Sequence, residues 1–307
     1  MMDYALLQAL VAVQQESSFE GAARSLGMTS SAVSQRIKQL EERIGAVLVH
    51  RNPTRPSPVG KLLCRHAEMV MLLEDQLVGE NSDCLKALNR DPFNIRISVN
   101  EDSLSSWFMD VLKPGNDNDY RFYFDIVLAD QDHSIKEMKS GEVLAGISSS
   151  KEPAQGFRSY PLGQQIYRAT ASPSFVELYF PDGITQDSFK NAPSLRYSEK
   201  DELQKQWIEQ IFGVNIELPF YTIPSTYGLI ESCLNDVAWG MNPAMLVDHH
   251  IASGDIVELT PNQTLNKSLY WHVSRVVDGT LSQVTQKVRK AANAHLLQVA
   301  SHPALVK

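Results

Sequence analysis

The sequence contains little cysteine and no long apolar run. Its three cysteines, Cys64, Cys84 and Cys233, are an odd number without a CxxC spacing, which favours reduced thiols in a cytosol over disulfides or a zinc site. No run of about 18 apolar residues, the minimum for a membrane span, is present. The N-terminus also lacks the basic tip and apolar segment of a signal peptide. We therefore expect a cytoplasmic protein without a membrane partner.

Signatures of common enzymes are missing as well. There is neither a G-x-S-x-G elbow for a serine nucleophile nor an HExxH zinc motif. His249 and His250 are adjacent, so on a helix they point about 100° apart and do not chelate one ion. We expect no catalytic residue, no metal and no cofactor.

The most informative segment, residues 19–41, predicts two helices joined by a tight turn. The first helix has an apolar face with small residues: Phe19, Ala22, Ala23 and Leu26. Gly27 suits the left-handed conformation that ends this helix, and Thr29 or Ser30 can cap the next one. The inward face of the second helix is apolar at helical spacing: Val33, Ile37, Leu40 and Ile44.

The rest of the second helix carries short or flexible hydrogen-bonding groups and positive charge. The candidate DNA contacts on it are Thr29, Ser30, Ser31, Ser34, Gln35, Arg36 and Lys38. Such side chains suit base edges and phosphates. An ordinary amphipathic helix pair would explain this segment alone, and its neighbours decide between the two interpretations.

Those neighbours complete a winged helix-turn-helix. An upstream helix with an apolar face completes a three-helix core through Leu6, Leu7, Leu10 and Val11. Downstream, Leu48 and Val49 predict a short strand followed by the proline-stiffened basic loop 50–56. Arg51 and Arg55 in this loop are placed to reach phosphates or a minor groove, as in a wing.

A long helix from Pro58 to Leu77 is predicted next, since residues 61–78 contain neither proline nor glycine. Its apolar seam consists of Leu63, Ala67, Val70, Leu73 and Leu77. A seam of this kind packs on a partner helix in a homodimer or on its own domain.

Charge is divided unevenly along the chain. Residues 1–61 carry a net charge of +2, whereas the whole chain of 307 residues carries −8, which leaves −10 for the remainder. A mildly basic N-terminal segment followed by an acidic remainder is typical of a protein that binds DNA at one end only.

The stretch AARSLGMTSSAVSQRIKQLE at residues 22–41, with the wing and long helix after it, resembles the LysR-type transcriptional regulators. Ser30 stands where many members have Gln, and Ser57-Pro58-Val59-Gly60 replaces the usual start of the linker helix. The resemblance implies an α/β multidomain chain. Its parts would be a winged helix-turn-helix domain (1–60), a linker or dimerisation helix with a hinge (61–91), and a two-lobed, periplasmic-binding-protein-like effector domain (92–307).

The pattern after residue 92 agrees with an α/β domain. Strands are predicted at 93–99, 122–128, 144–147, 219–223 and around 269–272, and helices at 103–112, 202–212, 225–234 and 282–300. The alternation favours a mostly parallel sheet covered on both faces. The two lobes implied by the resemblance are residues 92–162 with 268–307 and residues 163–267.

Several further segments, among them NEDSLSSW at residues 100–107 and WGMNP at 239–243, resemble the branch of the family that senses lysine and arginine. Members of this branch control exporters of basic amino acids and lysine biosynthetic genes, and one is described as an inhibitor of chromosome replication initiation. The candidate effector-binding residues lie beyond strand ends and at helix starts: Asp102, Ser103, Ser105, Asp130, Asp132, Ser225, Thr226 and Asn242. At Ala129 the branch tends to carry another acid.

We therefore expect a homodimer, pairing further into a tetramer, that binds double-stranded promoter DNA and changes RNA polymerase recruitment when L-lysine or L-arginine binds. A LysR-type regulator with a different small effector is one alternative. A small-molecule-binding protein without DNA function is another alternative. It does not account for the outward-facing Ser31, Gln35 and Lys38.

Overall fold

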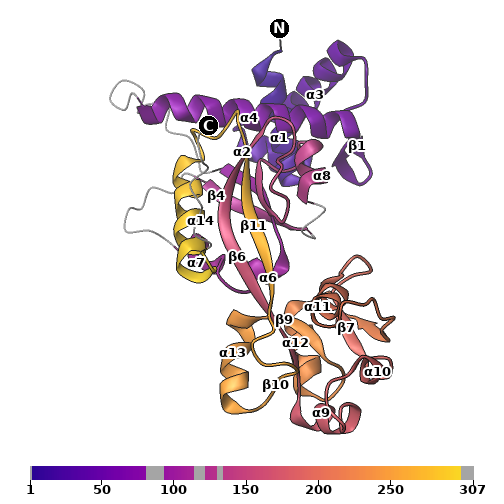
Figure 1. Cartoon of the computed structure of the whole chain (residues 1–307). Helices are drawn as coiled ribbons and strands as arrows, with labels where there is room; N and C mark the ends of the chain where they lie inside the picture. Colours follow the sequence, from indigo (N-terminus) through magenta and orange to yellow (C-terminus); the bar gives the residue numbers. More distant parts are fainter. Residues whose placement is uncertain (1, 81–92, 114–121, 130–133, 299–307) are drawn as a thin grey trace. The chain divides into compact units, whose positions relative to one another are not determined.

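The computed structural model describes residues 2–80, 93–113, 122–129 and 134–298 (Figure 1). The chain divides into two compact units, residues 1–91 with 276–280 and residues 92–275 with 281–307. Each unit is built on its own core, and the two are described separately below.

The first unit begins with three short helices, α1 (Tyr4–Glu16), α2 (Phe19–Ser25) and α3 (Ser30–Ile44). Hydroxyl caps start the second and third helices: Ser18 accepts from the N–H of Gly21, and Thr29 accepts from that of Ala32. Gly27 has a φ of +62°, as expected for the residue that ends α2. The buried face of α3 is Val33, Ile37 and Leu40. Ile44, expected to point inward, is 37% exposed because it closes the helix before Gly45.

The wing is an antiparallel hairpin of β1 (Val49–Arg51) and β2 (Thr54–Pro56). Glu41 Oε1 accepts from the backbone N–H groups of Leu48 at 2.8 Å and Val49 at 3.3 Å, which joins the base of the hairpin to α3. The C-terminal part of α3 therefore fixes where the β1–β2 hairpin starts.

The long helix α4 spans Pro58–Glu80 and packs on α1. Leu63 and Ala67, two of the five predicted dimerisation residues, are buried in the core of this unit and are unavailable to a partner helix. Val70 is half-buried, Leu73 is 37% exposed, and the side chain of Leu77 lies outside the described residues. The seam seen in the sequence is thus partly intramolecular, because α4 also closes the three-helix core.

A seven-stranded sheet runs through the second unit. Its strands are β3 (Phe93–Val99), β4 (Phe122–Leu128), β5 (Ala145–Ser148), β6 (Phe157–Ala171), β9 (Gly240–Pro243), β10 (Val257–Glu258) and β11 (Leu265–Ser274). The order is β10-β6-β11-β5-β3-β4, and β9 also pairs with β6. Among the described strands of this sheet, β3 pairs in parallel with β4 and with β5. The prediction of a mostly parallel sheet was therefore wrong: β6 and β11 are a long antiparallel pair, and the other pairs of the sheet are antiparallel too.

One lobe of this unit, lobe 1, carries β3, β4 and β5. Its helices are α6 (Glu101–Leu104), α7 (Met109–Leu112), α8 (Ser134–Lys139) and α14 (Ser282–His295). The helix predicted at 103–112 is broken into α6 and α7. Trp107 and Phe108 are both buried at the break, with ring centroids 5.7 Å apart. In one continuous helix these neighbours would point about 100° apart, so the break lets both enter the core.

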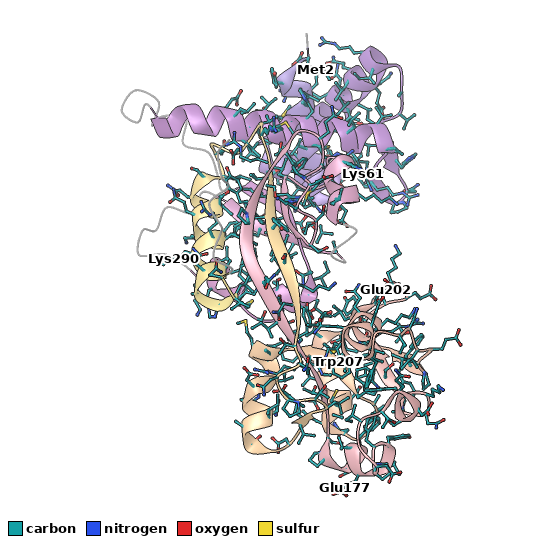
Figure 2. The ribbon with its side chains drawn as sticks, viewed as in Figure 1. Met2, Lys61, Glu177, Glu202, Trp207 and Lys290 are labelled. Carbon is teal, nitrogen blue, oxygen red and sulfur yellow. The ribbon has the colours of Figure 1, made fainter. Side chains whose placement is uncertain are left out.

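Lobe 2 contains a small parallel pair, β7 (Ser194–Arg196) with β8 (Phe220–Thr222). Its helices are α9 (Pro173–Tyr179), α10 (Gln186–Phe189), α11 (Leu203–Phe212), α12 (Thr226–Leu234) and α13 (Ala244–Ser253). The rings of Phe189, Trp207 and Trp239 pack edge-on or tilted, with centroids 5.1–6.0 Å apart. Trp207 lies inside this lobe and Glu177 on its surface (Figure 2).

Three further observations limit the chemistry of the described part of the chain. None of its helices is long and apolar enough to cross a membrane. Cys64 and Cys233 are free thiols in buried positions, and burial raises the pKa of both, that of Cys233 to about 11. No group of three or more His, Cys, Asp or Glu within the described residues is arranged to hold a metal ion.

Candidate functional site

The outward face of α3 and the wing form one polar surface in the first unit. Ser31, Gln35 and Lys38 are exposed on α3. The ammonium of Lys38 lies 3.8 Å from the carboxylate of Glu42 one turn on, both side chains being well exposed, so this pair is weak. Arg55 is exposed on β2. These exposed side chains can contact the phosphates and base edges of a nucleic acid.

Two arginines of this region are held by the protein itself. Arg51 of β1 donates to Ser34 Oγ at 3.0 Å, and its guanidinium lies over the ring of Phe19, 5.2 Å from the centroid. Arg36 donates to the carbonyl of Ala5 at 3.4 Å and therefore turns toward α1. Arg51 thus ties the wing to α2 and α3 while remaining exposed.

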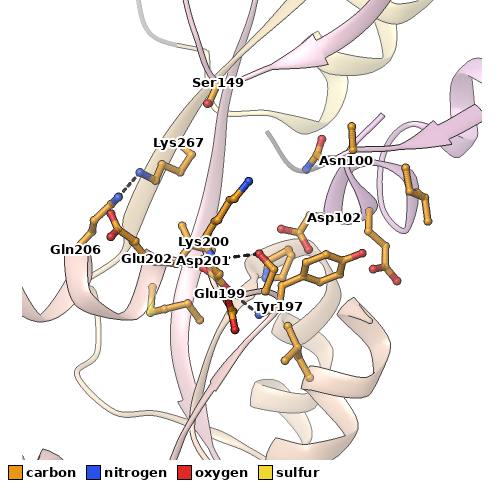
Figure 3. Close-up of a pocket in the computed structure, with 18 of the residues that line it drawn as sticks. Asn100, Asp102, Ser149, Tyr197, Glu199, Lys200, Asp201, Glu202, Gln206 and Lys267 are labelled. Atoms are coloured by element: carbon orange, nitrogen blue, oxygen red, sulfur yellow. Dashed lines mark hydrogen bonds between the residues drawn. The ribbon is translucent and has the colours of Figure 1, made fainter. Parts of the chain in front are cut away.

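A pocket of about 670 Å³ opens in the second unit. Residues of both lobes line it (Figure 3). Six of its lining residues are acids: Glu101, Asp102, Glu137, Glu199, Asp201 and Glu202. The lining contains two lysines, Lys200 and Lys267. The excess of four carboxylates over ammonium groups gives the pocket a negatively charged lining, which suits a small cationic ligand.

Asp102 connects the lobes at this pocket. Its carboxylate accepts from Tyr167 Oη and from Thr226 Oγ1, each at 2.6 Å. Burial raises the pKa of this carboxyl, and the hydroxyls of Thr226 and Tyr167 oppose the rise. The negative charges of Asp201 and Glu101 add to it. A cation bound beside Asp102 would stabilise the ionised form.

Asn100 is a further polar group at the pocket. It is 4% exposed, and neither atom of its side-chain amide has a hydrogen-bond partner among the described residues. Figure 3 shows it beside Asp102. A buried amide left without partners costs free energy, so a ligand that hydrogen-bonds to it gains that contribution.

The other predicted effector residues lie around the pocket or away from it. Ser103 is buried and donates to Gln165 at 3.5 Å, and Ser105 is the C-cap of α6. Ser225 caps α12 by accepting from the N–H of Gly228. Asn242 is buried in lobe 2, where its amide donates to Thr170 and Cys233. Thr226 does not line the pocket but donates to Asp102, which does. Asp130 and Asp132 lie outside the described residues. The roles of all these residues in effector binding stay predictions.

Sequence reasoning missed the segment 197–203 and Lys267. Glu199, Lys200, Asp201 and Glu202 are four consecutive charged residues ahead of α11, and this run is the signal that could have drawn attention to them. Lys267 belongs to β11 and carries no local motif, so only the tertiary structure brings it to the pocket.

Comparison with known proteins identifies the family. Residues 4–61 match the bacterial regulatory helix-turn-helix protein model of the lysR family. The transcriptional regulator ArgP of Pseudomonas aeruginosa is 34% identical over 306 residues, which cover 97% of this chain and 99% of that protein. The chain belongs to the LysR family of transcriptional regulators. The family prediction is therefore confirmed, and the matched residues 4–61 include α3 and the hairpin of β1 and β2.

Solved LysR-type structures agree with the fold. ArgP from Mycobacterium tuberculosis is 33% identical, with a TM-score of 0.76, and the match covers 97% of this chain and 100% of that one. Full-length LysG from Corynebacterium glutamicum, solved with bound effector Arg, is 28% identical with a TM-score of 0.64 and the same coverage. The N-terminal helix-turn-helix domain and the C-terminal effector domain are thus those of this family.

Gln35→Ala is expected to weaken binding to a specific DNA site by about 1–3 kcal/mol, with the loss confined to one base position. Gln35 is exposed on α3, and its amide can pair with a base edge. Fluorescence anisotropy on the selected site and its single-base variants measures this. Arg51→Ala is the comparison variant, with a similar loss on all sequences and a smaller salt dependence. An equal loss for Gln35→Ala on specific and random DNA would remove Gln35 from base recognition.

Proposed function

We propose that this LysR-type regulator senses a basic amino acid, L-lysine or L-arginine, in the pocket between its two lobes. The excess of carboxylates among the pocket residues carries this proposal. The related LysG structure with bound effector Arg supports it. Such a pocket repels anionic effectors and favours ligands with a net positive charge. Ala129 lines the pocket without contributing a charge, and the acids of the 199–202 segment line the same pocket.

The two lobes resemble those of periplasmic binding proteins, in which a ligand is held between lobes joined by crossing strands. Here β6 and β11 run through both lobes, and Asp102 of α6 is bonded to Thr226 of α12. A ligand that binds one arrangement of the lobes better than another shifts the population toward it. The effector therefore acts by changing the geometry in which DNA-binding domains are presented.

The working form on double-stranded DNA is a homodimer assembled through α4, pairing further into a tetramer. Apolar residues exposed on α4 lie at helical spacing: Val59, Leu62 and Leu73. They lie beside the partly intramolecular seam and give α4 an apolar stripe for a second copy. Each α3 enters a major groove, with half-sites about one helical turn apart. The regulated genes would serve export of basic amino acids or lysine metabolism in the cytoplasm, through RNA polymerase recruitment and without catalysis.

Affinity for the basic amino acid is expected to rise with pH. A bound cation lowers the pKa of Asp102, so binding releases a proton at pH values between the bound-state and free-state pKa of this carboxyl. Affinity therefore increases through that window and levels off above the raised free-state pKa. The free energy of unfolding without ligand depends on pH in the opposite direction. The contribution of Asp102 to stability is fully present below the pKa of Asp102 in the unfolded chain. It is lost as the pH rises through the higher pKa of Asp102 in the folded protein. Calorimetry at a series of pH values on both sides of the raised pKa of Asp102, each in two buffers, measures both the affinity and the proton release. A flat profile in the natural protein would contradict this role.

A thermal-shift titration against the twenty common L-amino acids tests the proposed function. A ligand at 100 times its dissociation constant stabilises the native state by about 2.7 kcal/mol. We expect a selective shift with L-lysine or L-arginine, and none with L-glutamate or L-leucine. Shifts only with neutral or acidic amino acids would overturn the proposal while leaving the family assignment intact.

A further inference from the structure

An amino acid also carries an α-carboxylate, which an acidic pocket repels unless a fixed cation compensates. Two cations line the pocket within the described residues, Lys200 and Lys267. We propose that Lys267 binds the α-carboxylate of the effector, whose cationic side chain extends toward Asn100 and Asp102. This inference rests on the proposed function and assigns the orientation of the ligand.

Lys267 is held in place by elements of the unit. It lies on β11 opposite Gln165 of β6 and is half-buried. Its ammonium donates to Gln206 Oε1 of α11. Gln206 is neutral, so this bond orients the ammonium without cancelling its charge. A positioned ammonium loses less conformational entropy on binding than a free lysine does.

Lys200 is less suited to this task. It is exposed and stands between Glu199 and Asp201 in the sequence. Two flanking carboxylates reduce the net positive potential that an anion meets there. Because both lysines line the same pocket, Lys200 is a matched control for Lys267.

The opposite side of the pocket is built for hydrogen-bond donors and positive charge. Figure 3 shows Asn100 and Asp102 on one side, and Lys267 with Gln206 on the other. Asn100 offers a buried amide oxygen without a partner among the described residues, and Asp102 offers a carboxylate. Glu101 Oε2 is likewise buried and without a partner there. An ammonium or guanidinium group satisfies such acceptors with charge-assisted hydrogen bonds.

This arrangement predicts that the pocket distinguishes amino acids from diamines. By charge alone, an acidic pocket would prefer agmatine or cadaverine, which lack a carboxylate and carry two positive groups. Lys267 reverses the preference, because its ammonium repels a second cation and attracts a carboxylate. The ligand class is therefore the free α-amino acid with a cationic side chain.

Calorimetric titration of the full chain with L-arginine, L-argininamide and agmatine tests this orientation, with L-lysine, L-lysinamide and cadaverine in parallel. The natural protein should bind the free amino acid about 10- to 100-fold more tightly than its amide. Lys267→Met should lose about that factor for the amino acid while keeping its affinity for the amide. Agmatine should bind Lys267→Met no more weakly than the natural protein. Lys200→Met should change the preference for the carboxylate little.

Lys267→Arg keeps the charge and should retain the preference, and the melting temperature of each variant without ligand reports its folding. Equal losses of amide and amino acid in a folded Lys267→Met would overturn the assignment of the carboxylate to Lys267. Equal binding of amino acid and amide by the natural protein would also overturn it. Absence of binding to any basic amino acid would instead reject the proposed function, and the inference with it.

Discussion

Asp102→Asn is expected to weaken binding of the basic amino acid by roughly 100-fold, which corresponds to about 2.7 kcal/mol. The substitution keeps the shape of the side chain and removes the negative charge beside which the cation binds. Hydrogen bonds to charged groups contribute about 1.5–3 kcal/mol, and this carboxylate lies in a buried setting where charge is poorly screened. Calorimetry with L-arginine and L-lysine measures the loss.

The fold should survive this change. An amide can accept from one of the two hydroxyls that now donate to Asp102, those of Tyr167 and Thr226, and donate to the other. Glu199→Gln is the matched control, since Glu199 also lines the pocket but is exposed, and its loss should be several-fold smaller. An Asp102→Asn variant that binds as tightly as the natural protein would exclude Asp102 from the binding site.

Gly60→Ala is expected to destabilise the first unit by about 1–3 kcal/mol. A Cβ added at Gly60 would lie 2.2 Å from the carbonyl oxygen of Leu48. The helix α4 must therefore move away from the backbone that precedes β1. Elsewhere in a helix this substitution usually stabilises by about 1 kcal/mol, so the sign of the effect is diagnostic. Denaturant unfolding of the full chain, followed by circular dichroism, measures it.

Lys61→Ala is the control for Gly60→Ala. Lys61 is the neighbouring position of α4 and is exposed, so its truncation should change stability by less than about 0.5 kcal/mol. Because Gly60 lies where α4 meets the strand that leads into the wing, Gly60→Ala should also weaken DNA binding. Unfolding of Gly60→Ala at the same denaturant concentration as the natural protein would show that this close approach is unimportant.

Local patterns predicted the first unit and several strands well. The strands at 93–99 and 122–128 have the predicted bounds. The first alternates apolar and polar residues, and the second is rich in aromatic and β-branched residues. Thr29 caps α3, as one of the two options from the sequence allowed. These features depend on neighbouring residues, which a sequence displays directly.

Features that depend on distant contacts were not predictable. The break between α6 and α7 follows from burial of both Trp107 and Phe108, which spacing alone does not require. Asn242 was expected at the cleft, but it donates to groups inside lobe 2. Lys267 reaches the pocket from β11, and the segment 199–202 reaches it from lobe 2. Their approach depends on how β6 and β11 cross between the lobes.

The most direct test of the central claim is DNA binding by the full chain with and without the amino acid. A DNA site selected from a random pool is titrated in saturating L-arginine or L-lysine, with L-citrulline as the neutral isostere of arginine. We expect the cationic amino acid, but not L-citrulline, to change the affinity for DNA by about 5- to 150-fold or to change the DNA bend. The change in affinity corresponds to a coupling free energy of about 1–3 kcal/mol. Identical affinity and bend with and without a cationic amino acid that the protein demonstrably binds would contradict an effector role for this pocket.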